Sequence, residues 1–329
     1  MGPKSVRRQG QLLVTPMGVT DERKRMNTAG VPNAYRIDLL LMPGTDPITG
    51  QPRAGFETIA QCEAEDLHRA VTLRTTARSI TAAKDRGTID AATSDLRIDP
   101  RKALNLADRL LAGIESGRPQ PTLASALFMR ELRLRVFRDM LELVDHHPGS
   151  DIATFTMIHP SWACSATSLL DVDARQIKNQ FRTHLTRAGV TNAPGFLLAC
   201  LHGEFEPISR EYQLHFHGVC AGEKLKALER LRAKQGYVRT DAIYRPIVIN
   251  PIRDRARQVS YTIQSFWPGK ARVPVGGDGV YRRQRSKTRI KEPYQSLYLL
   301  WLDSWKLNDL LSLNGVRMRR GKLERDSSG

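Results

Sequence analysis

Two histidines stand in a short apolar run, Tyr212-Gln213-Leu214-His215-Phe216-His217-Gly218-Val219-Cys220, which Gly222 closes. A run of this length and composition is typical of a buried β-strand. Because successive side chains of a strand point to opposite faces, His215 and His217 share one face. Two neutral imidazoles on one face can bind a divalent metal ion, although such a pair can also serve only in packing and hydrogen bonding. The run therefore predicts a buried sheet and leaves metal binding as one of two interpretations.

The chain is strongly basic. Its 329 residues include 51 Lys plus Arg against 34 Asp plus Glu, a formal net charge of +17. This length allows one large domain or two ordinary ones, with a sizeable core. Such a charge favours a polyanionic partner, nucleic acid first and an anionic membrane surface second. The longest compact apolar run, Phe196–Leu201, is too short to span a bilayer, so we expect DNA and no membrane as the partner.

Cysteine usage indicates a reducing compartment. The chain has four cysteines, Cys62, Cys164, Cys200 and Cys220. They show no Cys-x-x-Cys spacing and are interpreted as reduced thiols packed in the core. The first 25 residues carry Lys4, Arg7 and Arg8 but lack the apolar stretch of a secretory signal. These observations predict a cytoplasmic protein.

Composition divides the chain into four predicted parts. Residues 1–34 mix Arg, Lys, Gly, Pro and Thr without periodicity and are expected to form a flexible basic arm. Residues 35–148 are predicted to be a helical domain, because apolar residues recur at a spacing of three and four over 58–84, 101–116 and 122–144. Residues 149–292 are predicted to form a mixed domain in which strands alternate with helices. Residues 293–329 are predicted to be a helical extension, with its helix over 294–314.

Strands and helices alternate in the third part. Strands are predicted at 152–158, 195–206, 212–220 and 245–250, and helices at 173–187, 223–234 and 253–267. The second and third strands, separated by a short polar turn, are expected to form a hairpin. The order strand, helix, strand, strand, helix, strand, helix predicts an α+β fold, a split βαβ antiparallel sheet with helices packed on it.

A metal ion held by the histidine pair needs a third ligand. By parity, His202, Glu204 and Glu206 share one face of the neighbouring strand, so either glutamate could lie across from the pair. Gln264, on the predicted helix 253–267, could face the same sheet. Carboxylate and carboxamide oxygens suit hard divalent ions when phosphate is the substrate, so the expected cofactor is Mg²⁺ or Mn²⁺.

The predicted helix 253–267 also carries a candidate nucleophile, Tyr261. Helical spacing stacks Arg257, Tyr261 and either Gln264 or Ser265 along one flank. A phenol has a pKa near 10, so an attacking phenolate needs a cation nearby, and Arg257 is the predicted source. Taken alone, Tyr261 is better interpreted as a tyrosine at the edge of the core, and only its context favours a nucleophile.

Charge is concentrated between residues 251 and 291. This segment holds eleven Lys or Arg and two Asp, a local net charge of +9. Phe266, Trp267 and Tyr281 lie among the cations and could stack on unpaired bases. The predicted contacts with single-stranded DNA are Arg253, Arg255, Lys270, Arg272, Arg282, Arg283, Arg285, Lys287 and Arg289.

These motifs together resemble the HUH endonuclease superfamily, and within it the rolling-circle replication initiators of plasmids and phages. Those proteins have a Thr-rich first strand, a hairpin with a His-hydrophobic-His signature and a tyrosine on a later helix. Here Ala153-Thr154-Phe155-Thr156-Met157-Ile158, Gln213-Leu214-His215-Phe216-His217-Gly218 and Tyr261 take these places. The resemblance covers residues 150 to 268, under half of the chain.

The resemblance implies a metal-dependent, site-specific nickase of single-stranded DNA, in which Tyr261 forms a 5′-phosphotyrosine bond. His215 and His217 would hold the divalent ion, with Glu206 as the acidic third ligand and Glu204 as its competitor. The expected partners are single-stranded or origin DNA and a host helicase. The sequence leaves the oligomeric state open.

The chain departs from the family pattern at two positions. Many initiators have a lysine where this chain has Gln264, and two-tyrosine initiators have a second tyrosine where Ser265 stands. A single-tyrosine enzyme is therefore implied. Because Gln264 is similar to the metal-binding carboxamide of single-tyrosine transposases, a transposase stays an alternative. A catalytically degenerate DNA-binding replication or regulatory protein is a second alternative, which the missing lysine supports. Cupin-like oxygenases also use His-x-His strands, but Ala221 and Gly222 stand where that pattern needs a glutamate.

Overall fold

The computed structural model describes residues 44–45, 52–53, 57–88, 94–147, 151–240, 243–253, 255–264, 266–274, 281–283 and 287–326. The expected basic arm, residues 1–34, lies outside these ranges. None of the helices in the described ranges is long and apolar enough to cross a membrane.

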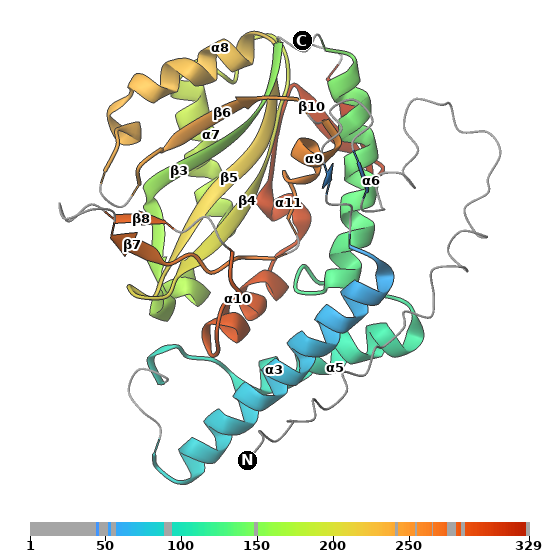
Figure 1. The fold of residues 1–329 in the computed structure, drawn as a ribbon, viewed down its shortest axis with the longest axis vertical. Helices are drawn as coiled ribbons and strands as arrows, with labels where there is room; N and C mark the ends of the chain where they lie inside the picture. Colours follow the sequence, from blue (N-terminus) through green and yellow to red (C-terminus); the bar gives the residue numbers. More distant parts are fainter. Residues whose placement is uncertain are drawn as a thin grey trace, which may run out of the picture.

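Three helices form the amino-terminal half of the described chain (Figure 1): α3 (Ile59–Asp85), α5 (Pro100–Ser116) and α6 (Ala126–Asp145). Each begins at a polar cap, because Thr58, Asp99 and Ser125 accept hydrogen bonds from first-turn N–H groups. Gly117 ends α5 with φ at 63°, a conformation that favours glycine. The three predicted helices are confirmed. A two-residue strand pair, β1 (Gly44–Thr45) with β2 (Pro52–Arg53), precedes them.

A five-stranded antiparallel sheet forms the centre of the fold, in the order β6-β3-β5-β4-β9. Its strands are β3 (Ile152–Ser165), β4 (Leu197–Glu206), β5 (Glu211–Ala221), β6 (Ile247–Pro251) and β9 (Leu311–Asn314). The strand that carries both histidines, β5, is central. The predicted hairpin of β4 and β5 is confirmed, and its register sets Cys200 opposite His217 and His202 opposite His215.

The helices α7 (Ala174–Arg187), α8 (Glu223–Arg230) and α9 (Arg255–Ser260) complete the predicted order of elements. That order and the α+β class are confirmed. Two short 3₁₀ turns follow α8, namely η3 (Leu231–Ala233) and η4 (Gln235–Tyr237). Behind the sheet in Figure 1, α7 packs through Phe181, whose ring stacks on Phe216 of β5 with centroids 3.9 Å apart.

The late helix is shorter than predicted. It ends at Ser260 instead of reaching residue 267, so Tyr261 lies on the turn that follows α9. The N–H of Thr262 closes this turn on the carbonyl of Val259. The N–H of Gln264, which a continuing helix would use in its own ladder, donates instead to Nε2 of His202 at 2.9 Å. A tertiary hydrogen bond therefore ends the helix.

The carboxyl-terminal extension is helical only at its start. The helices α10 (Tyr294–Asp303) and α11 (Leu307–Leu310) are followed by β9, which pairs with β4 from Leu197 to Cys200. The hairpin β10 (Val316–Arg319) and β11 (Lys322–Arg325) comes next. The prediction of helix to residue 314 was wrong, because the open edge of β4 offers backbone partners that override the local leucine spacing. Within the basic segment 251–291, β7 (Arg272–Pro274) pairs with β8 (Tyr281–Arg283).

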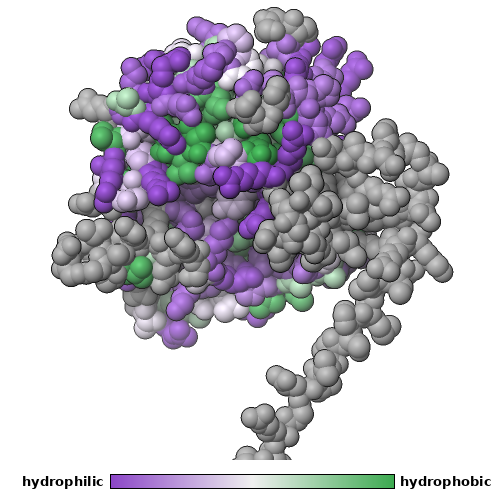
Figure 2. All heavy atoms as spheres, turned by 45° about the horizontal axis from the view of Figure 1, so that its top comes forward, coloured by the Kyte–Doolittle hydropathy of each residue, from purple (hydrophilic) through white to green (hydrophobic). Residues whose placement is uncertain are grey.

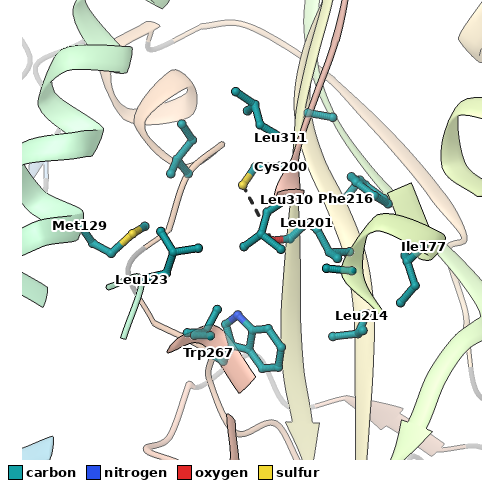
Figure 3. Close-up of a cluster of buried hydrophobic side chains, with 14 of the residues drawn as sticks. Leu123, Met129, Ile177, Cys200, Leu201, Leu214, Phe216, Trp267, Leu310 and Leu311 are labelled. Carbon is teal, nitrogen blue, oxygen red and sulfur yellow. Dashed lines mark hydrogen bonds between the residues drawn. The ribbon is translucent and has the colours of Figure 1, made fainter. Parts of the chain in front are cut away.

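One continuous hydrophobic core joins the amino-terminal helices to the sheet. Figure 3 shows side chains on both sides of the sheet, with Met129 and Cys200 on one side and Ile177 of α7 on the other. All four cysteines are free thiols, as predicted. On the face seen in Figure 2, hydrophilic side chains cover most of the described surface, with a smaller hydrophobic area among them.

Candidate active site on the central strand

The histidine pair lies at the centre of a polar cluster on one face of the sheet. The Nε2 atoms of His215 and His217 are 3.0 Å apart, and the two rings meet edge to face. His202 adds a third imidazole, whose ring centroid lies 5.2 Å from that of His217. The parity of the strands had placed His202 on this face, but only the hairpin register shows that it lies opposite His215.

Hydrogen bonds fix the orientation of both rings of the pair. Nδ1 of His215 lies 3.1 Å from the carbonyl of Gln213, and because a carbonyl only accepts, this nitrogen donates and Nε2 carries the lone pair. Nδ1 of His217 lies 2.8 Å from the hydroxyl of Thr156. Burial lowers the pKa of His215 to about 4, and burial with the neighbouring His215 lowers the pKa of His217 well below its usual value. Both rings are neutral at pH 7, as metal binding requires.

The spacing of the pair fits a divalent ion. Two metal–imidazole bonds of about 2.1 Å at a right angle separate their nitrogens by about 3.0 Å. The observed Nε2 separation is the same. The Gln213 carbonyl and the Thr156 hydroxyl are outer contacts of the kind that orient metal-binding histidines. Among the described residues, no group of three or more His, Cys, Asp and Glu side chains is arranged to hold a metal ion.

Gln264 and Glu204 each place a buried polar group near His202. The side-chain nitrogen Nε2 of Gln264 is buried without a hydrogen bond of ordinary geometry. If the oxygen and nitrogen of this side-chain amide are exchanged, the amide oxygen takes the position of Nε2 and is then an oxygen donor there. Glu204 is buried, two residues along β4 from His202, and forms an ion pair with Lys270 at 2.6 Å.

The structure does not bring Glu206 to the histidines. Its carboxylate lies at the hairpin end, where it accepts hydrogen bonds from the N–H groups of Ser209 and Arg272. Four residues of strand, about 13 Å, separate it from His202. Parity predicts the face on which a side chain lies, but only the register of the hairpin shows which residue of the neighbouring strand lies opposite it.

Tyr261 stands directly beside the pair. Its ring centroid is 4.9 Å from that of His217, and its hydroxyl accepts a hydrogen bond from Nζ of Lys287 at 3.0 Å. The tyrosine is 41% exposed, so a substrate can reach it. The cation that the structure places on the hydroxyl is Lys287, whereas Arg257 was predicted for this role. Sequence reasoning could not identify this cation, because Lys287 arrives from 26 residues away.

The surroundings of Tyr261 favour its phenolate. Partial burial by itself raises the pKa of the phenol. The hydrogen bond and charge of Lys287, the Gln264 amide and the charge of Lys270 outweigh that effect, so the pKa of Tyr261 lies below its ordinary value. A lowered pKa increases the fraction of phenolate at neutral pH, which is the form that attacks.

The predicted DNA contacts fall into different environments. Arg255 forms an ion pair with Asp145 at 2.6 Å, and Arg289 binds Glu65 of α3 through two hydrogen bonds of 2.9 and 2.6 Å. Arg253 is exposed, and Arg272 is half-buried. Arg282 and Arg283 lie on β8, whose side chains are not described, and Arg285 lies outside the described residues. Of the predicted contacts, Lys287 and Lys270 both act on the phenol of Tyr261 through their charge.

Comparison with family models, with curated proteins and with solved structures finds no match for this chain. What the site does must therefore follow from its own side chains.

Proposed function

We propose that this protein is a metal-dependent, site-specific nickase of single-stranded DNA that forms a 5′-phosphotyrosine intermediate, as an initiator of rolling-circle replication would. One observation carries the proposal: the ring of Tyr261 lies against His217 while Lys287 donates to its hydroxyl. A phenol with a lowered pKa, beside two neutral imidazoles and two lysines, has what attack on a phosphodiester requires.

Each residue of the site has a separate role in the proposed cleavage of the DNA strand. His215 and His217, with Gln264 or Glu204 as an oxygen donor, would hold a Mg²⁺ or Mn²⁺ ion, whose chemistry is to withdraw charge from the scissile phosphate. Tyr261 loses its proton to solvent, and the Lys287 ammonium stabilises the phenolate. The phenolate oxygen bonds to phosphorus as the bond from phosphorus to the 3′ oxygen breaks, and that oxygen takes a proton from water. The free 3′-hydroxyl can later reverse the step.

The surface beside the phenol suits an unpaired strand. Phe266 is 39% exposed, and the ammonium of Lys287 lies 5.5 Å from its ring centroid and 4.6 Å from that of Tyr261. An exposed ring next to a cation can stack on a base while the cation contacts the neighbouring phosphate, a pairing that binds single strands with little sequence preference.

Covalent capture of DNA tests the proposal directly. Incubated with Mn²⁺ and single-stranded oligonucleotides from the DNA that flanks its coding sequence, the protein should form an adduct that survives boiling in detergent and is destroyed by protease. Mn²⁺ should support more adduct than Mg²⁺, because imidazole ligands favour it. Excess chelator should prevent the reaction. The proposal fails if no flanking strand gives an adduct with any divalent ion.

The metal assignment has its own test. The double substitution His215→Ala and His217→Ala should remove Mn²⁺ binding, measured by calorimetry, together with adduct formation, while circular dichroism stays that of the folded protein. A matched control is His159→Ala with His184→Ala, a second histidine pair whose rings lie 4.8 Å apart. Equal Mn²⁺ binding by the two double variants would contradict the assignment.

A catalytically silent DNA-binding protein is the second candidate function. It is favoured by the hydrogen bonding of the pair, because Nε2 of His217 can donate to Nε2 of His215 and leave both rings satisfied without a metal. This candidate predicts DNA binding that neither chelator nor loss of the Tyr261 hydroxyl changes, with no adduct under any condition.

A further inference from the structure

The outer face of α7 has an unusual composition. The helix packs on the sheet through Ile177, Phe181 and Leu185. Its exposed positions hold only arginine, amide and threonine side chains: Arg175, Gln176, Asn179, Arg182, Thr183, Thr186 and Arg187. Because Phe216 of β5 contacts Phe181 while the two flanking histidines point the other way, this face lies on the side of the sheet opposite Tyr261.

Helix geometry arranges these side chains in an ordered way. At about 100° per residue, Asn179 lies near the middle of the exposed arc, with Arg182 towards one border and Arg187 towards the other. The 14 residues of α7 extend about 21 Å, at about 1.5 Å per residue. The side-chain amide of Asn179 therefore lies in the middle of the exposed face of α7, and the guanidinium groups of Arg182 and Arg187 lie on either side of it.

The two flanking arginines are available to a ligand. Arg175 is committed to Asp309 through an ion pair of 3.0 Å, whereas neither Arg182 nor Arg187 has an ion pair with any residue in the described ranges. An ordinary solvated helix mixes both signs of charge, as α8 does with its Glu223–Lys226 pair at 2.7 Å. Within Ala174–Arg187 the exposed charges are all positive, which matches a polyanion, and the exposed carboxylate of Asp173 beside them caps the first turn of the helix.

We propose that α7 binds duplex DNA by lying in the major groove. A groove about 12 Å wide admits an α-helix, and asparagine can bond both N6 and N7 of an adenine. Arg182 and Arg187 contact phosphates on the two walls of the groove and set the orientation of the helix, while Asn179 faces the base edges. The inference does not depend on Tyr261 chemistry. It gives the protein a surface for duplex DNA on the side of the sheet away from the site for the single strand.

Salt dependence tests the phosphate contacts. Affinity for a 24-base-pair duplex of mixed sequence is measured by fluorescence anisotropy at several NaCl concentrations, without divalent ions. The double substitution Arg182→Gln and Arg187→Gln should flatten the slope of log affinity against log salt by about 1.8, since each lost phosphate contact removes about 0.9. Lys226→Gln with Arg230→Gln, on α8, removes the same charge and should leave the slope unchanged. An unchanged slope in the α7 variant, or an equal change in both variants, overturns the proposal.

Sequence preference tests the base contact. Selection from a randomised duplex library should enrich an adenine at one position for the unaltered protein, and Asn179→Ala should reduce that preference by roughly tenfold or more. No enrichment, a preference that survives Asn179→Ala, or tighter binding of duplex RNA than of duplex DNA would each refute groove binding by α7. The α7 variants should still form the Tyr261 adduct with single-stranded DNA, so failure of this inference and failure of the nickase proposal give different results.

Discussion

Tyr261→Phe should reduce covalent capture of single-stranded DNA by roughly 10⁴-fold or more, because it removes the only oxygen of this side chain that can bond to phosphorus. Affinity for the same strand should stay nearly unchanged, since the ring remains against His217. The measurement is adduct yield on denaturing gels beside anisotropy of the unreacted complex.

Tyr244→Phe is the matched control for this substitution. Tyr244 is also 41% exposed, and the guanidinium of Arg239 lies 4.1 Å from its ring centroid. Exposure and a nearby cation are therefore common to both tyrosines, and only Tyr261 is proposed to attack. If the adduct persists in Tyr261→Phe and disappears in Tyr244→Phe, the nucleophile is misassigned, although phosphotyrosine chemistry itself would survive.

Acid should destabilise the fold through the histidine cluster. The pKa of His215 is about 4 in the folded protein because of burial, against about 6.5 in an unfolded chain. As the pH falls below 6.5, His215 is protonated in the unfolded chain but not yet in the folded protein. The free energy of unfolding, which has its full value above pH 6.5, therefore decreases as the pH falls towards 4. His215 alone should remove about 3 kcal/mol of unfolding free energy between pH 7 and pH 4. His202 and His217, whose pKa values are also lowered by burial, act in the same direction.

Urea unfolding at the two pH values measures this loss. His215→Gln, which keeps a polar side chain but has no group that titrates in this range, should lose about 3 kcal/mol less than the unaltered protein over the same interval. Equal acid sensitivity of the two proteins would show that other groups cause the loss.

Elements that depend on interactions between residues close in sequence were predicted correctly from local sequence patterns. The apolar run around His215, the polar turn before it and the helical pattern over residues 173–187 were sufficient for the β4–β5 hairpin and for α7. The late helix was overestimated because His202, 62 residues earlier, takes the N–H of Gln264. No spacing rule over residues 253–267 contains that information.

Of the candidate site, only the side chains on the central strand could be placed from the sequence. Parity placed His215 and His217 on one face, but the cation on Tyr261 depends on backbone pairing between Thr288 and Gly269, which brings Lys287 to the phenol. Charge counting likewise could not separate cations that face a ligand from cations such as Arg289, which Glu65 binds within the molecule. Both features are made by contacts between segments far apart in the sequence.

The last strand of the sheet comes from far along the chain, since Leu311 of β9 pairs with Cys200 of β4. Pairing across more than one hundred residues carries a high loop-closure cost, so we expect the sheet to close late in folding. Until β9 arrives, β4 presents unpaired N–H and C=O groups from Leu197 to Cys200, a template for strand addition by another molecule. A fragment that ends at residue 292 would keep this open edge permanently, and it should aggregate rather than yield an isolated catalytic module.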